Sequence, residues 1–297
     1  MKNILLYIIP FCTIAFGCSQ KFAGHSSVNL EVNSETGTPM LLGQCTENRL
    51  RHAPFDTWYT INYNSYAADT MTLMKFKKNL HHLRFEIFMG TWCSDSRREV
   101  PRIFRILHYC GVKPSQVKLV MLDNRDSTYK QSPEHEERGM NIHRVPDLIL
   151  FDGTKELGRI VESPVNSLEK DLERILQSDD YVPRYHAVSF LIKYFEEDSV
   201  IAENPDRLAS SLKPICSGPF ELNTYGYVLM AAGQLERAKL VFILNTIMYP
   251  DKPNVFDSLG EFFYKTGQRS LAKINYLKVL QLDPTNENAR KMTNVLQ

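Results

Sequence analysis

Residues 84–109 read RFEIFMGTWCSDSRREVPRIFRILHY, and this stretch decides the fold of the middle of the chain. The segment 84–89 is short, mostly apolar, and rich in aromatic and β-branched side chains, which predicts a buried strand. From 94 to about 109, apolar residues recur at helical spacing and arginines supply a polar face, which predicts a helix. The sequence therefore places Trp92 and Cys93 in the turn between a buried strand and a helix.

The segments that follow predict more strands and another helix. The apolar stretch 117–123 predicts a second strand, and 145–152 with 157–161 predict a hairpin around an Asp-Gly turn. Residues 167–176 have the pattern of a closing helix. Together these elements indicate an α/β domain over 48–178.

The middle of the chain resembles the thioredoxin-like superfamily over about 63–178. The run WCSDS at 92–96 stands where that family has Trp-Cys-x-x-Cys, between a central strand and a helix. Pro101 lies where family members commonly kink the helix. Val-Pro at 145–146 resembles the loop whose proline is cis in this fold and lies beside the active sulfur. The resemblance implies a central mixed sheet flanked by helices, with the active sulfur at Cys93.

A cysteine at the start of the predicted helix is well placed to act as a nucleophile. The unpaired N–H groups at the start of a helix carry partial positive charge and stabilise a thiolate, which is the nucleophile in disulfide exchange. A proline opposite the sulfur has no N–H and leaves an open strand edge for an extended peptide. The candidate catalytic residues are therefore Cys93, Trp92 and Pro146, with Val145 as a candidate client-binding residue.

Three departures from the family pattern bear on the chemistry. Ser96 replaces the second cysteine, so it cannot resolve a mixed disulfide at Cys93. Cys110 lies about 25 Å along the helix at 1.5 Å per residue, too far to be a resolving partner. Ile87 occupies the position of the family's buried acid, and Asp95 is either a substitute proton carrier or a helix-start acid favoured by the dipole. The site is thus monothiol in type, or a relic in a fold reused for binding.

The N-terminus has the features of an export signal. The chain runs mostly apolar from 4 to 16, too short to span a bilayer at about 20 residues but fitting a secretory signal. Ala-Phe-Gly before Cys18 resembles the lipobox of bacterial lipoproteins, which implies a signal peptide over 1–17 and diacylglycerol on Cys18. An ordinary cleaved signal or an uncleaved anchor are the alternatives. The polar stretch 18–47 sustains no period, which predicts a flexible tether.

The lipobox resemblance also predicts where the mature chain works. It implies an exported protein that a lipid anchor holds at a membrane, facing the periplasm or the cell exterior. Acyl chains tether a protein to the bilayer and do not thread it through.

The C-terminal third repeats every 34 residues and resembles the tetratricopeptide repeat. Small residues at such places let two helices of a pair approach closely. The resemblance predicts repeats over 219–252 and 253–286, a capping helix before 297, and a helical connector over 179–218. The matching positions are Gly226 and Gly260, Gly233 and Gly267, Ala238 and Ala272, and Pro250 and Pro284.

Tetratricopeptide arrays usually bind peptides on a concave face. By the family pattern, Asn223 and Tyr227 of the first repeat and Asp257 and Glu261 of the second point to that face. They are candidate client-binding residues. The alternative is that a short array packs on the α/β domain or dimerises.

Composition excludes several other classes of function. The chain has 35 basic and 34 acidic residues, which gives no argument for a nucleic-acid partner. No histidine pair has metal-ligand spacing and no Cys-x-x-Cys or nucleotide-binding glycine loop occurs, so neither a metal nor a cofactor is predicted. Cys45 and Cys216 lie outside the predicted core, and their pairing stays open.

Two hypotheses follow. In the first, an exported, membrane-anchored protein performs monothiol thiol–disulfide exchange on protein or peptide clients through Cys93, and the repeats present the client. In the second, a non-catalytic lipoprotein uses the thioredoxin-like domain as a scaffold and the repeats bind a partner in an assembly. Ser96 and Ile87 favour the second, whereas Trp92 and Cys93 with the Val-Pro loop favour the first. Client identity, redox direction and oligomeric state stay open.

Overall fold

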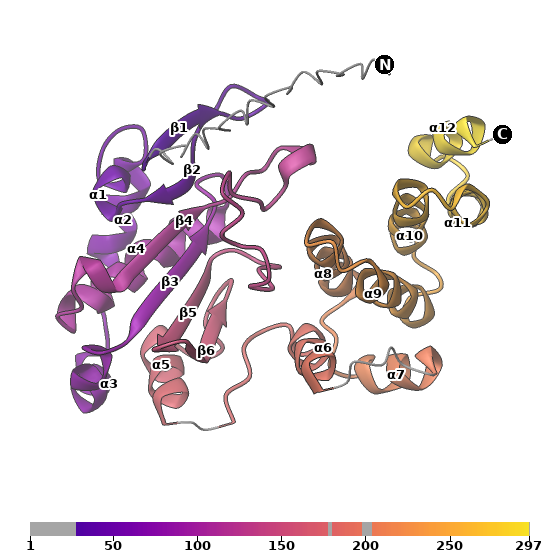
Figure 1. Cartoon of the computed structure of the whole chain (residues 1–297). Helices are drawn as coiled ribbons and strands as arrows, with labels where there is room; N and C mark the ends of the chain where they lie inside the picture. The colour runs from indigo at the N-terminus through magenta and orange to yellow at the C-terminus, as the bar shows by residue number, and fades with distance from the viewer. Residues whose placement is uncertain (1–27, 178–179, 198–203, 297) are drawn as a thin grey trace, which may run out of the picture.

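The computed structural model describes residues 28–177, 180–197 and 204–296. The expected signal peptide at 1–17 and the lipidated Cys18 lie outside these residues. The described chain contains a six-stranded mixed sheet with flanking helices, followed by a run of helices. Figure 1 shows the sheet and helices α1–α5 on one side and helices α6–α12 on the other.

The sheet is built around a parallel pair of strands, as the apolar segments predict. Its order is β1-β2-β4-β3-β5-β6, in which β3 pairs with β4 in parallel and all other neighbours are antiparallel. The predicted strands near 84–89 and 117–123 and the predicted hairpin are confirmed. The strands are β1 (Leu30–Asn33), β2 (Pro39–Cys45), β3 (Arg84–Met89), β4 (Val117–Met121), β5 (Asp147–Asp152) and β6 (Lys155–Val161).

The prediction of a flexible tether over 18–47 is wrong for its second half. β1 and β2 form a hairpin there, and β2 extends the sheet by pairing antiparallel with β4. The short apolar run of β2 is the physical reason, because Leu41 is fully buried in the core. Cys45, expected outside the core, is buried in it at the end of this strand. Residues 18–27 lie outside the described residues.

One face of the sheet carries the main core. Phe85 and Ile87 of β3 share a hydrophobic cluster with residues of all five flanking helices. Because side chains alternate along a strand, Phe88 faces the other side. There it packs with Ile142 and Val145 of the segment between β4 and β5. The helices are α1 (Glu47–Leu50), α2 (Asp56–Ser65), α3 (Thr70–Phe76), α4 (Ser94–Tyr109) and α5 (Leu168–Leu176), with short 3-10 turns at η1 (Lys77–Leu80), η2 (Pro114–Gln116) and η3 (Asp126–Thr128).

The C-terminal helices repeat at the interval that the sequence shows. α10 lies 34 residues after α8 at both ends, and α11 lies 34 residues after α9. A Cβ atom added at Gly226 would lie 2.6 Å from the ring of Phe242, and one at Gly260 would lie 3.2 Å from Tyr276. Glycine is therefore what lets the two helices of each pair come close. The helices are α6 (His186–Glu197), α7 (Pro205–Leu212), α8 (Pro219–Ala231), α9 (Leu235–Met248), α10 (Pro253–Lys265), α11 (Arg269–Leu282) and α12 (Glu287–Val295).

The segment between β4 and β5 joins the sheet to the C-terminal helices. The hydroxyl of Tyr225 donates to Oδ1 of Asn141 at 3.3 Å, and Arg144 donates to the carbonyl oxygen of Phe220 at 3.3 Å. His143 stands edge-on to the rings of Tyr185 and Tyr225. None of the helices in the three described stretches has both the length and the apolar character needed to cross a membrane.

Candidate functional site

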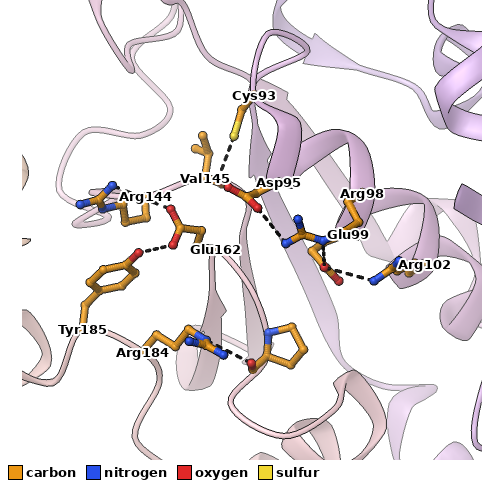
Figure 2. Close-up of polar contacts among 11 residues, drawn as sticks. Cys93, Asp95, Arg98, Glu99, Arg102, Arg144, Val145, Glu162, Arg184 and Tyr185 are labelled. Atoms are coloured by element: carbon orange, nitrogen blue, oxygen red, sulfur yellow. Dashed lines mark hydrogen bonds and ion pairs between the residues drawn. The ribbon is translucent and has the colours of Figure 1, made fainter. Parts of the chain in front are cut away.

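Cys93 lies at the N-terminal end of α4 with its backbone held on both sides. Its N–H donates to the carbonyl oxygen of Gly90 at 3.0 Å, and its own carbonyl oxygen accepts from the N–H of Arg97 at 3.0 Å. The side chain is half-buried, and Sγ donates to the carbonyl oxygen of Val145 at 3.3 Å, as Figure 2 shows. The peptide bond between Val145 and Pro146 is cis. The fold therefore brings the predicted sulfur and the predicted proline loop together.

Trp92 fixes the turn before the cysteine. Its indole N–H donates to the carbonyl oxygen of Leu122 at 2.8 Å, and its ring centroid lies 5.8 Å from that of Tyr129. The indole also lies over Gly90, where a Cβ atom would come within 2.4 Å of it. Any larger residue at position 90 would displace the indole, so this glycine is needed for the close contact.

Ser96 and Asp95 occupy different environments in the first turn of α4. Ser96 is fully buried, and its Oγ accepts from the N–H of Gly90 at 3.3 Å. Asp95 forms an ion pair with Arg98 at 2.7 Å, one turn along the helix. In Figure 2 this pair continues through Glu99 to Arg102. The contact of Asp95 is the one expected of a helix-start acid.

Lys130 is a residue of this site that sequence reasoning missed. It lies in the segment between β4 and β5 with only 6% of its surface exposed, and Nζ donates to the carbonyl oxygen of His143 at 2.6 Å. The pKa of Lys130 is lowered to about 7, mainly by burial and also by Arg144, whereas Cys93 and Glu162 act to raise it. No local pattern in the sequence signals this burial, because it arises from how the whole segment folds.

A second cluster of polar side chains, formed by Arg144, Glu162 and Tyr185, lies next to Val145. Arg144 comes within 3.8 Å of Glu162, and the hydroxyl of Tyr185 donates to the same carboxylate. The guanidinium of Arg144 also lies over the ring of Tyr185, 4.9 Å from its centroid. Figure 2 shows Val145 between this group and Cys93.

A cleft of about 960 Å³ opens between the β4–β5 segment and helices α8 and α10. The predicted binding residues Asn223, Tyr227 and Glu261 line one side, and the hydroxyl of Tyr227 donates to Glu261 at 2.6 Å across the two helices. Tyr129 and Lys130 line the other side. The ring of Tyr129 also packs on Trp92, so this residue connects the cleft to the turn that carries Cys93.

Asp257, also predicted to bind a client, does not line the cleft. It accepts a hydrogen bond from Nδ2 of Asn288 at 2.8 Å, and Asn288 belongs to the closing helix α12. Burial raises the pKa of Asp257. Helix α12 thus binds the carboxylate of Asp257, which the tetratricopeptide pattern predicts to lie on an open concave face.

The other cysteines differ from Cys93 in burial. Burial raises the pKa of Cys45 to about 12 and that of Cys110 to about 11, and it also raises the pKa of Cys216. These four cysteines are all free thiols in the described part of the chain. Across the same residues, no three His, Cys, Asp or Glu side chains are grouped so that they could hold a metal ion.

Comparison with known proteins adds no relative to this description. A scan against protein-family models finds no matching family. A search of the curated proteins finds no match either. The functional interpretation therefore depends on the residues and the geometry of the Cys93 site and the cleft.

Proposed function

We propose that this protein is a thioredoxin-like protein that performs monothiol-type thiol–disulfide exchange on protein clients through Cys93. One observation carries the proposal: a half-buried thiol at the start of α4 lies 3.3 Å from the carbonyl oxygen of Val145, in the proline loop. The order of strand, turn, helix and proline loop is the order that the resemblance of the WCSDS segment to thioredoxin-like proteins implies.

The chemistry needs one thiol on the protein and one disulfide on the client. Cys93 loses its proton to solvent, and its sulfur bonds to one client sulfur as the client S–S bond breaks. The second client sulfur leaves as a thiolate and takes up a proton. Because Ser96 cannot resolve the mixed disulfide, a thiol of the client or a small thiol completes the exchange.

The cleft supports binding of a protein segment beside this thiol. Its volume is at the upper end of the range of about 300–1,000 Å³ found for ligand pockets. Asn223, Tyr227 and Glu261 supply polar groups on the side of the tetratricopeptide-like helices. A client segment held there contacts Tyr129, whose ring packs on Trp92, the neighbour of Cys93.

Export and anchoring are part of the same proposal and depend on the lipobox resemblance at Cys18. Lipidation there would hold the protein at a membrane, facing the periplasm or cell exterior, where disulfide-bonded clients occur. The expected outcome of metabolic labelling with a fatty acid is a labelled protein whose label is lost in Cys18→Ser. An unlabelled wild-type protein would contradict a lipid anchor.

The proposal is tested by trapping mixed disulfides with a disulfide-bonded model protein and locating the bond by mass spectrometry. We expect trapping at Cys93 and its loss in Cys93→Ser. Cys216 is the matched internal control, because its Sγ also donates to a carbonyl oxygen, that of Gly218 at 3.4 Å, from a half-buried position. Equal trapping at both cysteines would contradict a specialised site.

A non-catalytic interaction protein is the second candidate, favoured by the buried hydroxyl of Ser96 where dithiol reduction would need a second sulfur. In that case the sheet domain is a scaffold and the cleft binds a partner in an assembly. A single variant distinguishes the two functions. Cys93→Ser abolishes the first, whereas it leaves the binding of a partner, and the phenotype of the cell, unchanged in the second.

A further inference from the structure

The backbone around Lys130 is held in one arrangement. Lys130 has a φ of +58°, in the left-handed region, and its N–H donates to the carbonyl oxygen of Asp123 at 2.9 Å. Oδ2 of Asp123 accepts from the hydroxyl of Thr128 at 2.7 Å and from Nε of Arg125 at 2.7 Å. These contacts close the chain between β4 and Lys130 into a compact turn and direct the lysine inward.

The ammonium group then lies in a place that lacks an obvious anion. Among the side chains that the structure describes, no carboxylate comes within ion-pair distance of Lys130. Its one hydrogen-bond acceptor is the carbonyl oxygen of His143. A buried charge without a partner is costly, which is why burial lowers the pKa of Lys130 to about 7. A nearby negative group is therefore needed to keep the ammonium form at neutral pH.

Among the charged groups around Lys130, the thiolate of Cys93 is the candidate for this negative group. Those that act on Lys130 are Arg144, Glu162 and Cys93. Arg144 and Glu162 face each other at 3.8 Å, and Cys93 raises the pKa of Lys130 more than Glu162 does. Tyr129, whose ring lies 5.0 Å from Nζ of Lys130, is a neutral phenol at physiological pH because burial raises its pKa.

Two series of contacts position the ammonium group of Lys130 and the sulfur of Cys93 against the same segment of the chain. Nζ of Lys130 is bound to the carbonyl oxygen of His143, and two residues further on Val145 accepts from Sγ of Cys93. On the other side, the ring of Tyr129 packs on Trp92, the neighbour of Cys93. The position of the lysine relative to the sulfur is therefore set by the same segment that forms the proline loop.

We propose that Lys130 is the counter-cation of the Cys93 thiolate and a positioning residue for thiol–disulfide exchange. The inference rests on the proposed function and specifies how this site makes a nucleophile without the buried acid that Ile87 replaces. When the thiolate attacks, its charge passes to the departing client sulfur, and the ammonium stabilises that sulfur until it takes up a solvent proton. One client sulfur is reduced to a thiol, Cys93 is oxidised, and the bond between Cys93 and the other client sulfur replaces the client disulfide.

The test is the pH profile of Cys93 alkylation by iodoacetamide in the full-length protein, read at each cysteine by mass spectrometry. In Lys130→Gln, which keeps a donor for His143 but removes the charge, we expect the midpoint to rise by about one pH unit, as loss of a nearby opposite charge predicts. The rate at pH values below both midpoints then falls about tenfold. Lys130→Arg, which keeps the charge, is expected to retain the wild-type midpoint.

Controls separate this effect from a structural one. Arg144→Gln removes the other nearby cation and is expected to move the midpoint less than Lys130→Gln does. The alkylation of Cys216 reports on the fold and is expected to stay unchanged in all three variants. If Lys130→Gln loosens the fold, Lys130→Met provides a second neutral residue, and thermal unfolding identifies whichever variant remains folded.

The outcomes distinguish the two proposals. If wild-type Cys93 is alkylated at pH 7 no faster than Cys216, the proposed exchange function itself is overturned. If Cys93 is fast and Lys130→Gln leaves its profile unchanged, the exchange function survives and the role of Lys130 is overturned. A shift in Arg144→Gln that exceeds the shift in Lys130→Gln also overturns the assignment to Lys130.

Discussion

At the scale of single residues, position separates two thiols that look alike locally. Cys93 and Cys216 are both half-buried, and each donates to a carbonyl oxygen at 3.3 to 3.4 Å. Only Cys93 stands at the start of a long helix, where unpaired N–H groups favour a negative charge, and beside a buried lysine. The proposal thus attributes the expected reactivity of Cys93 to its surroundings and not to its exposure.

Ser96→Cys tests what the missing second sulfur does. Position 96 is one helical turn from Cys93 and points inward to the same turn, so we expect the variant to close an intramolecular disulfide with Cys93. Trapped mixed disulfides with a model client then fall at least about tenfold, since an intramolecular thiol competes at high effective concentration. Quantitative non-reducing electrophoresis measures the change. Ser94→Cys, exposed on the helix, is the control and should still accumulate mixed disulfide.

At the scale of elements, the C-terminal helix pairs depend on close contact at two glycines. Gly226 meets the ring of Phe242, which is fully buried, and Gly260 meets the ring of Tyr276. The space is smaller at the first glycine by more than half an ångström, as the distances of 2.6 and 3.2 Å for an added Cβ atom show. The two repeats are therefore alike in sequence but not equally tight.

Gly226→Ala is expected to lower the free energy of unfolding by about 1–2 kcal/mol, since overpacking costs about 1–3 kcal/mol and outweighs the gain in helix propensity. Gly260→Ala is expected to be close to neutral, because the looser contact lets that gain offset the strain. Urea unfolding of the two variants provides the comparison. Adding Phe242→Leu should rescue Gly226→Ala, and equal destabilisation by both alanines would contradict the packing argument.

At the scale of the whole molecule, the segment between β4 and β5 serves three purposes. It covers the second face of the sheet, it carries Lys130 into the Cys93 site, and it binds helix α8 through Asn141. Two titratable groups, His143 and Asp147, are buried at this junction. Burial lowers the pKa of His143 to about 3 and raises that of Asp147 to about 7, although Arg159 pairs with Asp147 at 3.2 Å.

These two groups make opposite contributions to the pH dependence of stability. The depressed pKa of His143 means that its contribution is full above about pH 6.5 and is lost as the pH falls toward 3. The raised pKa of Asp147 means that its contribution is full below about pH 4 and is lost as the pH rises through 7. Between these limits the two slopes cancel.

Single substitutions are expected to reveal each slope. In Asp147→Asn, stability rises with pH between about 4 and 6.5, because His143 remains, with a slope of at most about 1.4 kcal/mol per pH unit. In His143→Gln, stability falls with pH over the same window. Urea unfolding at several pH values measures both, and parallel pH profiles in the two variants would contradict this assignment.

Much of the architecture follows from local patterns in the sequence. Apolar runs and helical spacing predicted β3, α4 and β4, and the 34-residue interval predicted the spacing of helices α8 to α11. The hairpin of β1 and β2 was missed, because its strands are too short to sustain a period and β2 becomes buried by pairing with β4. Local patterns predict the secondary structure of a segment, but not which other segments it will pack against.

The candidate site divides in the same way. The sequence by itself determined the residues at the centre, Cys93 at the start of a helix and Pro146 in its loop, because both follow from short motifs and backbone chemistry. Only the tertiary structure decided that Lys130 is buried beside them and that α12 takes up Asp257. The reason is physical: burial and charge pairing arise between segments far apart in the chain, so they exist only once the chain has packed.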